Sequence, residues 1–308
     1  MHVFIAGGTG FLGRQVVREF FNAGHRVSLL IHRTLSEPLP HTCHTYHGNI
    51  TNFRWSELEA DLPDVIIHLA RIPGRFLPGR LTGGLQGRAA NHRLITWMRQ
   101  LERPPLLLFT SGTLVYGSQE SLPIDEQSPM QPISFQKYYA LAEYPVLKAL
   151  SSSLPTRIIR PPWVFGRGSW FYQFYKKPMQ QEGFVPVYGS GSQYMSLISL
   201  EEFGQLVRLI AETSTGNDIF NTVSNMPVRQ HQFAGLLSEI SGLPCQTITT
   251  DQLHRKYGKT VAEALTHSLF VQTKHSRLYQ IEPEPLEKLK RQLETVLQPS
   301  RDYKRLER

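Results

Sequence analysis

The fold is decided by the stretch Val3-Phe4-Ile5-Ala6-Gly7-Gly8-Thr9-Gly10-Phe11-Leu12-Gly13. Its first four residues are apolar and stop at glycines, which is typical of a buried parallel strand. Apolar residues then recur at helical spacing and predict a helix from Phe11 to Asn22, which ends at Gly24. Glycines between a strand and a helix allow a sharp turn and the close approach of a pyrophosphate to the helix N-terminus. The stretch therefore predicts a dinucleotide-binding unit.

The alternation of strands and helices continues along the first half of the chain. Short apolar runs at residues 27–31, 66–70, 106–110 and 158–159 predict strands, and residues 89–101 predict a helix. Such alternation favours an α/β fold, a Rossmann-type doubly wound parallel sheet covered on both faces. We expect the NAD(P)-binding Rossmann domain to span residues 1–165.

The second half of the chain is less regular and predicts a smaller substrate-binding region over residues 166–308. Helical spacing predicts helices at Leu200–Glu212, Gln230–Ser241 and residues 286–297. Within this half, we expect residues 200–224 to pack back on the Rossmann domain.

The composition of the 308 residues excludes several classes of protein. A hydrophobic fraction of 40% excludes disorder, and two cysteines, Cys43 and Cys245, are too few for a disulfide scaffold. No apolar run approaches the roughly 18 residues of a membrane span, and no secretory leader fits the first residues. We therefore expect a cytoplasmic protein without a membrane partner. The net charge of +8 is compatible with an acidic ligand or with nucleic acid.

The end of the second predicted strand bears on the type of dinucleotide. A carboxylate about 20 residues beyond the glycine loop would bind the ribose 2′-hydroxyl of NAD. The residues there are Ile31, His32 and Arg33, and none of them is acidic. A guanidinium group pairs well with a 2′-phosphate, so we expect NADP(H) in preference to NAD. The alternative is that Arg33 is a solvated loop residue.

Several motifs follow the glycine loop in order along the chain. They are Gly48-Asn49-Ile50-Thr51, Asp64-Val65-Ile66-Ile67-His68-Leu69-Ala70, Thr110-Ser111-Gly112-Thr113-Leu114-Val115-Tyr116-Gly117 and Arg160-Pro161-Pro162-Trp163-Val164-Phe165-Gly166. Together with Val187-Tyr188-Gly189-Ser190-Gly191-Ser192-Gln193 and Phe220-Asn221-Thr222-Val223, they cover nearly the whole chain and resemble the extended short-chain dehydrogenase/reductases, the NAD(P)-dependent epimerase/dehydratase group. In that group the motif that corresponds to Gly48-Asn49-Ile50-Thr51 lies beside the adenine, and it carries Asp where this chain has Asn49. The resemblance implies these cofactor contacts: Gly7, Gly10, Phe11, Leu12, Gly13, His32, Arg33, Asn49, Ile50, Leu69, Ala70, Arg71, Asn91, Pro161 and Val164.

The catalytic positions depart from this family. Its members carry Tyr-x-x-x-Lys on one helix face, with Glu eight residues after the Tyr. Alignment on Glu143 puts Phe135 at the Tyr position and Tyr139 at the Lys position, and no other register restores the pair. The usual strand hydroxyl falls at Gly112.

Two interpretations remain, because Phe135 cannot exchange a proton. In one, Tyr139 or Tyr138, helped by Thr113 or Ser111, performs altered acid–base chemistry as an oxidoreductase, isomerase or dehydratase. In the other, the site binds a nucleotide without turnover and the protein is a regulator or assembly factor. Packing of Tyr138 and Tyr139 in the helix is an equally good structural interpretation.

Substrate-side residues disfavour a nucleotide sugar. Enzymes of the family that use nucleotide sugars carry an Arg for the diphosphate where this chain has Met195. A small organic substrate is expected instead, and an aromatic one is favoured by ring-bearing residues that alternatively form a core. These residues are Phe165, Trp170, Phe171, Tyr172, Phe174 and Tyr175.

Positive charge is concentrated between Arg71 and Arg103, where Glu102 is the only acid. Glycines predict that the first half of this segment is a flexible loop, which the resemblance places over the active-site mouth. Its arginines favour an anionic small molecule, or form a solvated basic loop. Nucleic acid is disfavoured because no aromatic-interleaved motif is present. The resemblance places a homodimer interface on the following helix.

A metal site is not expected. His41, Cys43 and His47 would share one face of a strand, but no second pair of ligands follows them at a suitable spacing.

Overall fold

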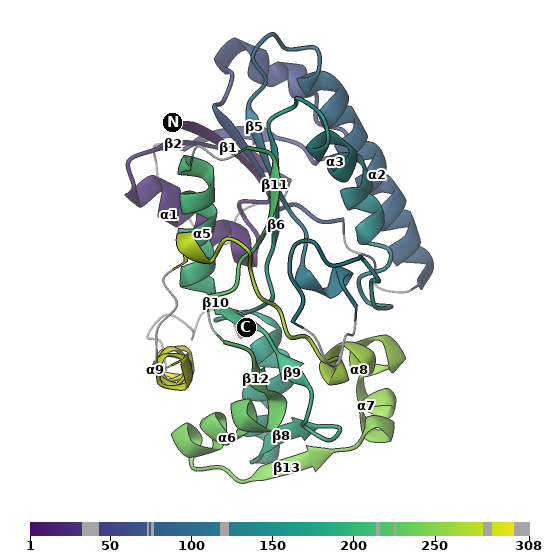
Figure 1. Cartoon of the computed structure of the whole chain (residues 1–308), viewed down its shortest axis with the longest axis vertical. Coiled ribbons are helices and arrows are strands. Elements are labelled where there is room, and N and C mark those ends of the chain that lie inside the picture. Colours follow the sequence, from purple (N-terminus) through teal and green to yellow (C-terminus); the bar gives the residue numbers. More distant parts are fainter. Residues whose placement is uncertain are drawn as a thin grey trace.

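The computed structural model describes residues 1–32, 43–72, 74, 77–117, 123–213, 216–224, 226–279 and 285–298. Its centre is a seven-stranded sheet in the order β11-β6-β5-β4-β1-β2-β3, and all pairings in this sheet are parallel (Figure 1). The strands are β1 (His2–Ala6), β2 (Arg26–Ile31), β3 (His44–His47), β4 (Val65–His68), β5 (Leu106–Thr110), β6 (Thr156–Arg160) and β11 (Asp218–Asn221). The strand order reverses between β1 and β4, which makes a crevice at their carboxyl ends. The predicted Rossmann-type doubly wound sheet is confirmed.

Helices cover both faces of the sheet (Figure 1). On one face lie α1 (Phe11–Asn22) and α5 (Leu200–Glu212), and on the other lie α2 (Leu77–Met98) and α3 (Ala140–Leu150). Successive side chains of β1 alternate between the two faces, so Val3 and Ile5 join the α1 and α5 core while Phe4 and Ala6 join the other. Because both faces are covered, the central strands β1, β4 and β5 are nearly continuous apolar runs.

The helix α2 differs from the prediction. Residues 89–101 were expected to be helical after a flexible glycine-rich loop, yet the helix begins at Leu77. A Cβ added at Gly84 would lie 2.1 Å from the Tyr138 carbonyl oxygen, and one at Gly87 would lie 3.0 Å from the Ala142 Cβ. The glycines therefore allow α2 to approach the start of α3 closely, and they do not make a loop.

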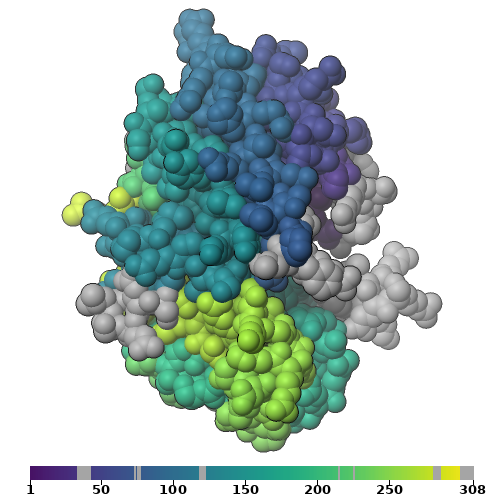
Figure 2. All heavy atoms as spheres, turned by 90° about the vertical axis from the view of Figure 1, so that its right-hand side faces the viewer, coloured from purple at the N-terminus to yellow at the C-terminus, as the bar shows by residue number. Residues whose placement is uncertain are grey.

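Most of the second half of the chain lies below the residues of the first half (Figure 2). It pairs β7 with β10, β9 with β12 and β8 with β13 in three two-stranded sheets. The strands are β7 (Trp163–Phe165), β8 (Val185–Tyr188), β9 (Tyr194–Met195), β10 (Leu197–Ser199), β12 (Val228–Arg229) and β13 (Cys245–Ile248). The helices are α4 (Lys177–Glu182), α6 (Gln230–Ser241), α7 (Thr250–Tyr257), α8 (Lys259–Thr266) and α9 (Pro285–Leu297). Short 3-10 helices lie at Trp55–Asp61, Thr113–Val115 and Ser276–Leu278, and a π-helix lies at Tyr172–Lys176.

Aromatic residues fill the core of this second half. Phe171 and Tyr175 are each 1% exposed, and the Tyr175 ring centre lies 5.0 Å from that of Phe233. Phe165 is fully buried in the same core. For these three residues the structure supports the core interpretation over a substrate pocket. Within the described ranges, no helix is long and apolar enough to cross a membrane, and no three ligand-type side chains cluster as a metal site would require. His41 lies outside the described residues.

Candidate functional site

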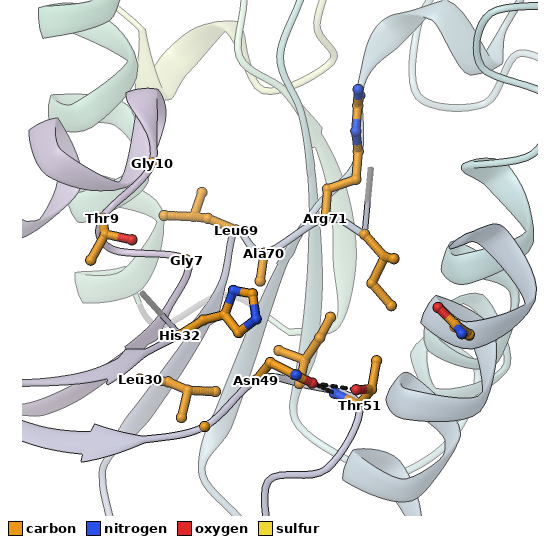
Figure 3. Close-up of a pocket in the computed structure, with 14 residues that line it drawn as sticks. Gly7, Thr9, Gly10, Leu30, His32, Asn49, Thr51, Leu69, Ala70 and Arg71 are labelled. Carbon is orange, nitrogen blue, oxygen red and sulfur yellow. Dashed lines mark hydrogen bonds between the residues drawn. The ribbon is translucent and has the colours of Figure 1, made fainter. Parts of the chain in front are cut away.

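A pocket of about 430 Å³ lies at the carboxyl ends of β1, β2 and β4 (Figure 3). This is the crevice in which open α/β sheets bind ligands. The pocket combines the backbone of the glycine loop with residues that follow β2, β3 and β4. It is lined by Gly7, Thr9, Gly10, Leu30, His32, Gly48, Asn49, Ile50, Thr51, Leu69, Ala70, Arg71, Ile72 and Gln86.

The glycine loop needs its glycines for steric reasons. Gly7 has φ of 90°, and a Cβ there would lie 2.6 Å from the Ala70 nitrogen. A Cβ at Gly13 would lie 2.0 Å from the Gly7 carbonyl oxygen. The N-cap of α1 is Gly10, which has no side chain to accept the first N–H groups of the helix. Those N–H groups are therefore available to an anion such as a pyrophosphate.

The opposite end of the pocket is formed by the residues after β2 and β3. The Asn49 Oδ1 accepts a hydrogen bond of 2.8 Å from the Thr51 backbone N–H and a second one from the Thr51 hydroxyl (Figure 3). His32 extends from the end of β2 into this region. No described residue that lines the pocket is acidic. Arg33, the predicted partner of a 2′-phosphate, lies outside the described residues.

A second, smaller chamber of about 60 Å³ adjoins the pocket and shares Ile50, Ala70, Arg71 and Ile72 with it. Polar groups without a hydrogen-bond partner among the described residues face it, so they can serve a ligand or water. These groups are the His68 ring nitrogens, the Asn91 Oδ1 and the Thr110 hydroxyl. Burial lowers the pKa of His68 to about 4, so its imidazole is neutral at pH 7.

Tyr139 lines the chamber and lies beside Arg71. The Arg71 guanidinium carbon is 3.8 Å from the centre of the Tyr139 ring and 5.8 Å from that of Phe135. The Tyr139 residue is 9% exposed and caps the start of α3. A cation thus stands beside the one phenol of the chamber.

Ser111 also lines the chamber, but its hydroxyl donates a hydrogen bond of 2.6 Å to the Glu143 Oε2. The other oxygen of Glu143 accepts a 2.7 Å contact from Arg160, and both members of this ion pair are 1% exposed. Burial opposes the charge of Arg160, yet the Glu143 carboxylate raises the pKa of that guanidinium. The Ser111 hydroxyl is therefore held by a buried ion pair.

The structure gathers most of the predicted cofactor residues. Those that line the larger pocket are Gly7, Gly10, His32, Asn49, Ile50, Leu69, Ala70 and Arg71. Asn91 lines the chamber, where its Nδ2 donates a 2.7 Å hydrogen bond to the Ala142 carbonyl. Lining neither cavity are Phe11, Leu12, Gly13, Pro161 and Val164.

Of the four candidate catalytic residues, Ser111 and Tyr139 share the chamber, whereas Thr113 and Tyr138 line neither cavity. Sequence reasoning missed Thr9, Leu30, Gly48, Thr51, Ile72 and Gln86. Thr9, Gly48 and Thr51 lie inside quoted motifs, so their motif membership was a usable signal. Gln86 lies on the part of α2 that was expected to be a loop.

A family model described as the NAD dependent epimerase/dehydratase family matches residues 3–222. The chain belongs to this family. The epimerase family protein SDR39U1 of Mus musculus is 27% identical over 263 residues, which cover 79% of this chain and 82% of that protein.

Solved structures of this epimerase/dehydratase type share the fold of the chain. One is human epimerase family protein SDR39U1 with NADPH, with a TM-score of 0.76 and 20% identity, covering 96% of this chain and 99% of that one. Another is MoeE5 in complex with UDP-glucuronic acid and NAD, with a TM-score of 0.75 and 18% identity. The match covers 96% of this chain and 100% of that one.

Proposed function

We propose that the chain binds NADP(H) and acts as an oxidoreductase, isomerase or dehydratase on a small organic substrate. The observation that carries the proposal is the adjacency of the two cavities. The larger pocket and the chamber lined by Tyr139 and Ser111 share Ala70 and Arg71 in their walls. A ligand that fills the pocket would therefore end beside the groups able to move a proton.

The residues of the pocket fit a nicotinamide dinucleotide. Gly10 provides no side-chain cap for the first N–H groups of α1, and the lining includes His32 and Arg71 but no described acid. The absence of a carboxylate at His32 favours NADP(H) over NAD. The NADPH named with the human relative supports the same preference. When bound, the nicotinamide supplies hydride transfer.

The chain's own residues supply the proton chemistry in this proposal. The Tyr139 phenol exchanges a proton with the substrate, and Arg71 supplies the positive charge beside it that the family obtains from a lysine. The Ser111 hydroxyl donates its proton to Glu143, so its oxygen is left to accept a hydrogen bond from a hydroxyl group of the substrate. Thr113 and Tyr138 take a supporting role in packing.

The test is direct titration with NADPH and with NADH, followed by fluorescence or calorimetry. We expect NADPH to bind more tightly than NADH. Absence of binding by either would reject the proposal. A screen of small carbonyl and hydroxyl compounds then measures turnover: net reduction appears as loss of NADPH absorbance, and isomerisation or dehydration, which return the hydride, appear as new products in chromatography.

A second candidate is a nucleotide-binding regulator or assembly factor. Gly112 offers no hydroxyl at the usual position, and the Ser111 proton is already directed to Glu143. If NADPH binds but no compound in the screen is turned over, this second function is favoured. A predicted homodimer and a cytoplasmic location remain predictions.

A further inference from the structure

Two arginines from different elements pack against one aromatic ring beside the chamber. Arg71 follows β4, and Arg80 lies near the start of α2. Their guanidinium carbons are 5.8 Å and 5.5 Å from the centre of the Phe135 ring. Arg71 also covers Tyr139. Both guanidinium groups therefore lie within the range of a cation–π contact with the same ring.

Neither arginine makes an ion pair with an acid in the part of the chain that the structure describes. The Arg80 Nε is buried and has no hydrogen-bond partner there. Two like charges held close together repel each other, and a buried N–H of a cation is costly when it is unpaired. An anion between the two side chains would relieve both penalties.

The position of Arg71 separates this anion from the cofactor phosphates. Figure 3 shows Ala70 between Arg71 and the loop of Gly7 and Gly10, with the Arg71 side chain directed away from that loop. Arg71 lines both the pocket and the chamber. An anion held by Arg71 and Arg80 would therefore lie on the substrate side of the site.

We propose that Arg71 and Arg80 bind an oxyanion of the substrate, a carboxylate or a phosphate ester, against the face of Phe135. This inference rests on the proposed function and names its substrate class. It also accounts for phenylalanine at a position where the family has tyrosine, because Phe135 provides a ring face for two guanidinium groups and needs no hydroxyl to do so. Guanidinium forks match the oxygens of both anions.

The test titrates the NADPH-loaded protein with benzoate, with phenyl phosphate and with uncharged benzyl alcohol, followed by calorimetry. We expect at least one anion to bind about tenfold or more tightly than benzyl alcohol. Benzoate binding alone assigns a carboxylate, and phenyl phosphate binding alone assigns a phosphate ester. Arg80→Gln should weaken anion binding about tenfold or more and leave NADPH affinity unchanged.

The matched control is Arg88→Gln, which lies on the same helix with its guanidinium 5.0 Å from the Tyr144 ring and outside both cavities. It should leave anion binding unchanged. Arg80→Gln should not lower the unfolding temperature, because it removes one of two repelling charges. Failure of both anions to bind, or an equal loss from both variants, overturns the inference.

Two outcomes separate this inference from the proposed function. If Arg80→Gln weakens NADPH as much as the anion, the arginines serve the cofactor and the inference is wrong. If NADPH does not bind at all, the proposed function fails. The anion titration with the free protein then decides the oxyanion site by itself.

Discussion

Arg71 lies over Tyr139, with its guanidinium carbon 3.8 Å from the centre of the phenol ring. The two residues come from different elements, because Arg71 follows β4 and Tyr139 directly precedes α3. From the sequence, Tyr139 is expected at the position where the family carries a lysine. In the structure, a cation lies beside this phenol.

Tyr139→Phe should abolish most of any turnover found with NADPH. Loss of a positioned acid or base lowers rates by about 10²–10⁴-fold, while cofactor affinity should change little. Steady-state rates and NADPH titration measure the two effects. The control is Tyr138→Phe, the neighbouring phenol, which lines neither cavity and should leave the rate near that of the wild type. Equal losses in both variants would contradict a catalytic Tyr139.

His32→Asp should reverse the cofactor preference. A carboxylate at the end of β2 would repel a 2′-phosphate and accept the 2′-hydroxyl of NADH. Arg33→Asp should likewise weaken NADPH more than NADH. Paired titrations with the two cofactors give the ratio of their Kd values. Equal weakening of NADPH and NADH would argue against any contact with the 2′-phosphate.

Two glycine substitutions should separate folding from binding. Gly13→Ala forces a Cβ to 2.0 Å from the Gly7 carbonyl oxygen, so we expect the free energy of unfolding to fall by about 1–3 kcal/mol or more. Gly10→Ala brings its Cβ no closer than 3.3 Å to that oxygen, yet Gly10 lines the pocket. It should keep the fold and weaken NADPH about tenfold or more. Urea unfolding and NADPH titration test both, and a destabilised Gly10→Ala would refute the distinction.

Glu143→Gln should destabilise the protein. The substitution leaves the guanidinium of Arg160 buried without a counter-charge, which costs about 3–5 kcal/mol. Glu57→Gln breaks an exposed ion pair with Arg54 and should cost about 1 kcal/mol or less. Urea unfolding of the two variants gives the comparison. Similar costs would show that burial does not strengthen the Arg160 pair.

Stability should fall as the pH drops below 6.5, in part because of His68. Its folded pKa of about 4 lies below the ordinary 6.5, so only the unfolded chain takes up this proton between those values. Between about pH 7 and about pH 5 this uptake costs about 2 kcal/mol. His68→Asn should flatten the dependence, whereas His92→Gln, at an exposed position, should not. Urea unfolding at pH 7 and pH 5 measures the change in the free energy of unfolding. An unchanged pH dependence in His68→Asn would show that His68 is not its cause.

Local patterns predicted much of the fold. The bounds of α1, α5 and α6 agree with the helical spacing, and β1, β2, β4, β5 and β6 follow the short apolar runs, whereas β3 and β11 were not predicted. These elements depend on nearby residues, since one stripe or one buried strand determines each. The start of α2 was wrong, because glycines that usually break a helix here allow close contact with Tyr138 and Ala142.

The candidate site was predictable only where it lies within a motif. The glycine loop and the residues after β4 are local and were predicted. The contact of Arg71 and Arg80 with Phe135 depends on how α2 and the segment before α3 pack together, and no spacing in the sequence indicates it. The engagement of Ser111 by Glu143 is likewise a tertiary contact.

The outer neighbour of β6 is β11, which ends at Asn221 and is parallel to β6. During synthesis, a nascent chain that has reached only Phe165 contains six of the seven strands of the central sheet and leaves the outer edge of β6 without a partner. An unpaired strand edge invites pairing with other chains. We therefore expect the nascent chain to need protection from aggregation until β11 has left the ribosome. A fragment that ends at residue 165 should aggregate more than one that ends at residue 224.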